Sequence, residues 1–91
     1  MTNEKELLLT AKELINLMDS AQAAWYVIMN HQLPKELADI KYKECERLEK
    51  SIENRFVRIN ILNGYLKKPM VDKHNLYQYC QELCKSETAV N

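Results

Sequence analysis

Apolar residues recur at alternating steps of four and three along the beginning of this chain. A repeat of about 3.5 residues lays a narrow apolar stripe along one side of a helix. The first stripe comprises Leu7, Ala11, Leu14, Met18, Ala21, Trp25 and Ile28. A second stripe repeats the pattern with one irregular step through Cys45, Leu48, Ile52, Phe56, Ile59, Leu62 and Leu66. The two stripes predict an all-α fold built on a long antiparallel helical hairpin.

The residues around the first stripe predict where the first helix begins and ends. Asn3 followed by Glu6 has the spacing of a capping box, with Asn in place of the usual Ser or Thr. Pro34 suits the first turn of a new helix, where a missing N–H costs nothing. We therefore expect a first helix over about 4–30, and a second that begins near 34.

Residues 57–68 allow two interpretations. Residues 57–61 alternate apolar and polar, and Asn63-Gly64 follows, which is the pattern of a β-hairpin with a tight turn. However, the helical stripe continues to Leu66, Asn-Gly also ends helices, and an isolated hairpin is marginal in water. We favour a second helix over about 34–63. Val57 and Ile61 then point away from the stripe and need cover from a third helix or another chain.

A short third helix is expected over about 71–85. Asp72 is a candidate cap, and Leu76, Cys80 and Leu83 would form its inner line. Residues 86–91 are expected to form a frayed tail. The chain is thus predicted to be one helical domain over 1–91, a small helical bundle.

Length and composition agree with a helical domain that gains from self-association. A chain of 91 residues lies near the lower end of what one core stabilises alone, so a second copy would supply burial that the monomer lacks. One glycine and two prolines leave few sites for tight turns, which argues against an all-β or doubly wound fold.

The formal net charge is zero, so no global field attracts nucleic acid or an anionic membrane. The signs are nevertheless unevenly spread, since residues 55–74 carry five basic side chains against Asp72 alone. They are Arg55, Arg58, Lys67, Lys68 and Lys73. Cations beside tyrosines can hold phosphates and stack bases, so a nucleic-acid-binding regulator that uses this basic end is the alternative function.

Neither a metal site nor a catalytic site is predicted. Cys45, Cys80, Cys84 and His74 lack the close ligand pairs of a zinc site, and buried cysteines commonly act as small apolar residues. His31 and His74 come without a phosphate loop, a nucleophile-elbow sequence or paired carboxylates in an apolar stretch. We expect no enzyme activity, no metal and no cofactor.

The cysteines and the first residues of the chain indicate the cellular compartment of the protein. Three cysteines among helix-forming residues favour free thiols in a reducing environment. The chain starts without a basic region before an apolar run, and its longest apolar run, 23–29, is far too short for a membrane span. We expect a cytoplasmic protein without membrane association, in a bacterium or delivered into a host cell.

A helical hairpin offers surface rather than a pocket. The sequence therefore favours a small adaptor, chaperone, inhibitor or regulator that binds another protein through a helical face. Aromatic and apolar residues that fall beside the stripes are the candidate contacts, since such residues are enriched at interaction hot spots. They are Tyr26, Val57, Ile61, Tyr65 and Tyr77. The partner could be a second copy, which would make a homodimer.

Overall fold

The computed structural model describes the backbone of residues 2–90 and the side chains of residues 2–86. The elements are α1 (Asn3–Asn30), α2 (Lys35–Tyr65), a 3₁₀ turn η1 (Lys73–Asn75) and α3 (Leu76–Val90). Residues 2–90 contain no strand. The all-α fold, with a long hairpin and a short third helix, is therefore confirmed. The β-hairpin alternative for residues 57–68 is wrong.

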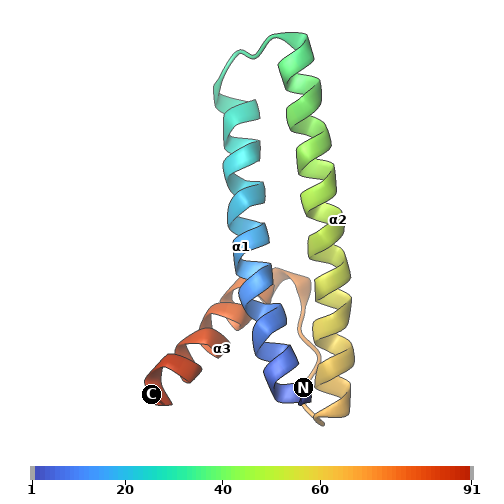
Figure 1. The fold of residues 1–91 in the computed structure, drawn as a ribbon, viewed down its shortest axis with the longest axis vertical. Coiled ribbons are helices and arrows are strands. Elements are labelled where there is room, and N and C mark those ends of the chain that lie inside the picture. The colour runs from blue at the N-terminus through green and yellow to red at the C-terminus, as the bar shows by residue number, and fades with distance from the viewer. Residues whose placement is uncertain (1, 91) are drawn as a thin grey trace.

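The hairpin sets the elongated shape of the molecule, 48 × 25 × 24 Å (Figure 1). After α2, the connector runs back along the hairpin, and α3 begins partway up before it runs away from the α1–α2 loop. We call residues 21–50 the arm, and residues 3–20 and 51–65 the stem. α3 packs on the stem and leaves the arm as a two-helix structure.

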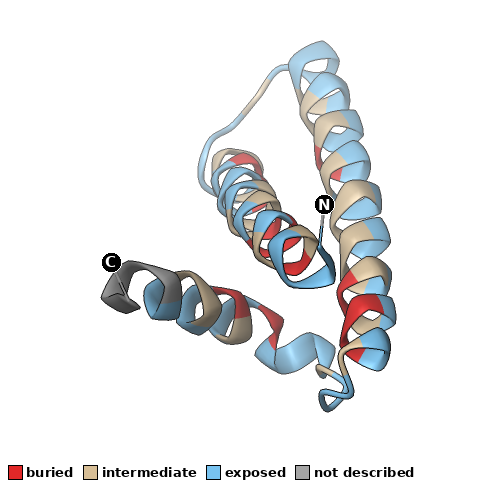
Figure 2. Cartoon of the chain, turned by 60° about the horizontal axis from the view of Figure 1, so that its bottom comes forward, coloured by how far each residue is buried: buried red, intermediate tan, exposed pale blue. Residues whose placement is uncertain are grey.

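The main core lies in the stem, where three helices meet (Figure 2). It contains Leu7, Ala11, Leu14, Ile59, Leu62, Leu76 and Cys80. In the arm, the buried residues are the small side chains of Ala21, Ala24 and Cys45. In the arm, two helices bury only the narrow line of residues along which they touch. In the stem, a third helix covers further side chains of both. Every residue of the two predicted stripes is buried or half-buried, so both stripes are confirmed.

The N-terminal caps differ in part from the sequence expectation. Thr2, not Asn3, caps α1, and its hydroxyl accepts a hydrogen bond of 3.2 Å from the Lys5 amide. Asn3 is already the first helical residue. The Asp72 cap is confirmed, since its carboxylate accepts from the His74 amide at 3.5 Å, but η1 precedes the helix.

The third helix is displaced along the chain relative to its predicted range of 71–85. It begins at Leu76 and continues to Val90. α3 thus includes residues 86–90 of the stretch where a frayed tail is expected, and Asn91 lies outside the described residues.

α2 passes through Asn63-Gly64 and ends two residues later, at Tyr65. The Lys68 amide donates to the Asn63 carbonyl at 2.8 Å, and the Lys67 amide donates to the Gly64 carbonyl at 3.3 Å. These two bonds form a Schellman motif, whose left-handed residue is Lys67 with φ 59°. α2 ends two residues beyond the expected end near Asn63, because Lys67, rather than Gly64, supplies the left-handed residue.

Candidate protein-binding surface

The segment from the connector to α3 is anchored along one side of the hairpin by side-chain hydrogen bonds. The Asn60 amide brackets Val71, donating to its carbonyl at 3.2 Å and accepting from its N–H at 2.8 Å. Lys73 bonds Glu53 on α2 at 2.6 Å, and the Tyr77 hydroxyl donates to Asp19 on α1 at 2.8 Å. This side of the stem is therefore closed.

The same side of the hairpin continues past the start of α3 into the arm. Residues spaced by three, four or seven share one side of a helix. Tyr26 lies seven residues beyond Asp19, so it shares the α1 face that Tyr77 contacts. Glu49 precedes Glu53 by four residues on the corresponding face of α2. We call the arm surface around Trp25, Tyr26, Met29 and Tyr42, which α3 does not cover, the open groove.

Aromatic side chains line the open groove. The Trp25 indole N–H donates to the Glu49 carboxylate at 3.0 Å, and its ring meets the Tyr42 ring edge-on with centroids 5.7 Å apart. These contacts bridge α1 and α2 across the arm. Tyr26, Met29 and Tyr42 remain exposed, at 62%, 78% and 46%. The open groove is thus an apolar, aromatic surface that this chain leaves in water.

Exposed carboxylates lie along α2 in the arm and at the start of the stem. They are Asp39, Glu46, Glu49 and Glu53, all exposed and separated by steps of seven, three and four. Asp19 stands on the α1 side, where it accepts the hydrogen bond from Tyr77. The nearby basic group Lys73 already pairs with Glu53. Lys43, Arg47 and Lys50 lie exposed among these carboxylates, so the charges along this surface of α2 are mixed.

The five predicted partner-binding residues lie at three places. Val57, Ile61 and Tyr65 form one exposed stripe on the outer side of α2, which α3 leaves uncovered. We call these three residues the stem stripe. Tyr26 lies in the open groove. Tyr77 is used inside the chain, because its hydroxyl bonds Asp19.

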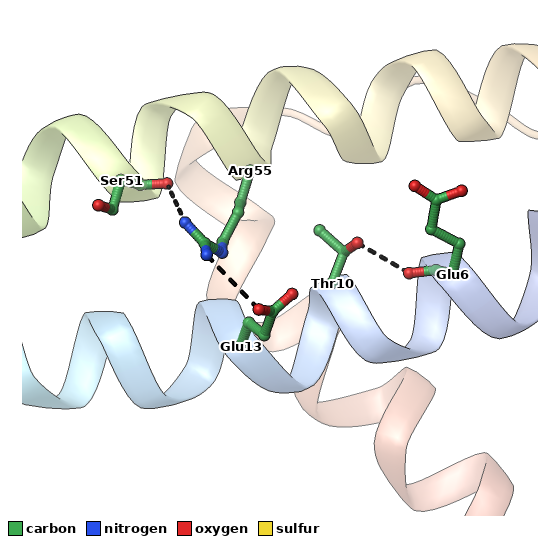
Figure 3. A network of polar contacts seen from close by, with 5 residues as sticks. All are labelled: Glu6, Thr10, Glu13, Ser51 and Arg55. Carbon is green, nitrogen blue, oxygen red and sulfur yellow. Dashed lines mark hydrogen bonds and ion pairs between the residues drawn. The ribbon is translucent and has the colours of Figure 1, made fainter.

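The basic residues predicted to contact phosphate are largely engaged within the chain. Arg55 contacts Glu13 at 3.5 Å and donates to the Ser51 carbonyl at 3.3 Å (Figure 3). Its Nε is buried without a hydrogen-bond partner. The Arg58 Nε donates to Glu6 at 2.9 Å. Both guanidinium groups thus join α2 to α1 and are not presented as free cations.

The remaining basic residues are separated along the fold. Lys73 pairs with Glu53 beside the start of α3, whereas Lys67 and Lys68 lie exposed at the turn after α2. The five predicted cations therefore do not form one patch with free charges.

Cys45 and Cys80 lie buried in the protein. Burial, with a smaller contribution from Cys84, raises the pKa of the Cys80 thiol to about 12. Burial also raises the pKa of Cys45, to which Glu44 and Glu49 add. Both thiols stay protonated at neutral pH, so they are poor nucleophiles.

Among the described residues, no group of three or more His, Cys, Asp or Glu side chains is placed to hold a metal ion. No described helix combines the length and apolar character that a membrane crossing requires.

Sequence reasoning missed Met29 and Tyr42 as surface residues of the open groove. Tyr42 falls outside the second stripe, in a stretch dense with charges, and was therefore not assigned a role. Met29 follows the last residue of the first stripe. The position of Tyr42 between the carboxylates of Asp39 and Glu46 was a usable signal. An aromatic side chain on a charged face of a helix stays in water unless a neighbouring element covers it.

Comparisons with protein-family models, with curated proteins and with solved structures found no match.

Proposed function

We propose that this chain is a protein-binding module, of the adaptor, chaperone, inhibitor or regulator kind, that works through a helical face of its arm. The open groove is the observation that supports this role. Tyr26 and Tyr42 are exposed, and the half-buried Trp25 is held in place by Glu49 and Tyr42. Large, ordered aromatic groups are the residue types that dominate binding energy when a partner covers them.

The proposed role is non-enzymatic and belongs to a reducing, cytoplasmic compartment. His31 packs edge-on against Tyr26 near the loop of the hairpin, whereas His74 lies in η1 on the stem. The two histidines are thus far apart along the fold and share no acid–base site. Cys45 and Cys80 are buried thiols outside any disulfide, which supports a reducing environment.

The nucleic-acid alternative has weaker support. Arg55 and Arg58 engage carboxylates of α1, and Lys73 engages Glu53. Phosphate contacts would have to replace these ion pairs before they contributed affinity. A protein face also fits the neutral chain better, because non-specific binding to nucleic acid comes almost entirely from uncompensated positive charge.

We also propose self-association through the stem stripe. Val57, Ile61 and Tyr65 remain exposed after α3 has packed elsewhere. A two-fold contact would place this stripe against itself. Light scattering over a concentration series is expected to detect dimers that Ile61→Glu abolishes. A strict monomer at high micromolar concentration would remove self-association from the proposal without affecting the arm.

Affinity capture with matched variants tests the protein-binding role. The intact chain and a Tyr26→Ala/Tyr42→Ala variant are used as baits in native extract, with nuclease added to remove bridging nucleic acid. Leu9→Ala serves as the control, since Leu9 is an exposed apolar residue of α1 outside both proposed surfaces. We expect proteins that the intact chain and the control retain and the double variant loses. Equal retention by all three baits would contradict a role for the arm.

A further inference from the structure

We draw no further inference here: the strongest candidate, the apolar groove between the connector after α2 and the first turns of α3, lined by Met70, Val71, Tyr79 and Leu83, carries nothing because nothing in the structure shows what covers it.

Discussion

Asn63 is a fully buried polar side chain in the core of the stem. Its Oδ1 accepts a hydrogen bond of 3.2 Å from the Tyr79 hydroxyl, while its Nδ2 is buried without a hydrogen-bond partner. A buried amide is tolerated when its bonds are made and costs stability when they are not. The bond from Tyr79 therefore helps to fix where α3 sits on α2.

Removing the Tyr79 hydroxyl should lower the stability of the protein, because it takes away the hydrogen bond of the buried Asn63 side chain. We expect Tyr79→Phe to lower the free energy of unfolding by about 1–3 kcal/mol, because Asn63 then has neither side-chain group paired. In an Asn63→Leu background the same change should cost markedly less. Urea denaturation followed by circular dichroism measures the four free energies. Tyr65→Phe, at an exposed tyrosine, controls for the loss of a hydroxyl. Equal costs in both backgrounds would exclude coupling.

Cys80 makes stability depend on alkaline pH. Its thiol has a pKa of about 12 in the folded chain, raised from the ordinary value of 9.0 chiefly by burial. Above pH 9 the unfolded chain loses this proton and the folded chain keeps it, so the contribution of the group to stability falls as pH rises from about 9 to 12.

A comparison with Cys80→Ala isolates that contribution. Below pH 9 the intact chain should be the more stable protein by a constant margin, because alanine leaves a small cavity. Between pH 9 and 11 the margin should shrink, since alanine does not titrate while other groups change equally in both proteins. Urea denaturation under reducing conditions measures it. A margin that stays constant to pH 11 would show that Cys80 is not protected from ionisation.

At the scale of elements, the residue that adopts the left-handed conformation at the end of α2 is not the glycine. Gly64 occupies a helical position, and a β-carbon built there meets no atom within 4 Å. Lys67 instead adopts the left-handed conformation, which glycine tolerates better than lysine.

Opposite substitutions at these two residues should both stabilise the protein. We expect Gly64→Ala to raise the free energy of unfolding by about 0.5–1 kcal/mol, because glycine is a poor helix former. Lys67→Gly should raise it by up to about 1 kcal/mol, by relieving the left-handed strain. Thermal unfolding reads out each variant and the pair. If α2 ended near Asn63, as expected from the sequence, with Gly64 as its left-handed residue, Gly64→Ala would instead destabilise the chain.

At the scale of the whole molecule, stability should be uneven along the hairpin. The stem is enclosed by three helices, whereas the arm buries only small side chains among its described residues. Regions with few buried apolar contacts open at lower free energy than the global unfolding transition.

Native-state hydrogen exchange should therefore rank the two halves. Amides of residues 7–14 and 56–63 are expected to exchange through global unfolding, and those of residues 21–30 and 38–48 through a smaller opening. Leu76→Ala should lower protection in the stem by about 2–5 kcal/mol, the usual cost of emptying a core leucine site. Uniform protection along α1 and α2 would contradict this division.

Much of the architecture follows from the sequence because helical periodicity is a local property. The stripes through Leu14 and Ile59 predicted both long helices, and the break at Pro34 placed their connection. Local chemistry also identified the Asp72 cap. It failed at Gly64, where the residue type favours a turn but packing of Leu62 and Leu66 against the core extends the helix.

Which surfaces stay exposed could not be predicted from the residue pattern of a single helix. Whether Val57 or Tyr26 is covered is decided by the path of the connector, which Asn60 holds through Val71. That path places α3 on one side of the stem and leaves the aromatic residues of the arm in water. Likewise, Arg55 reads as a free cation until α1 brings Glu13 opposite it. The sequence by itself determined which residues face inward along each helix. The tertiary structure decided which outward faces remain open, because that depends on contacts between distant segments.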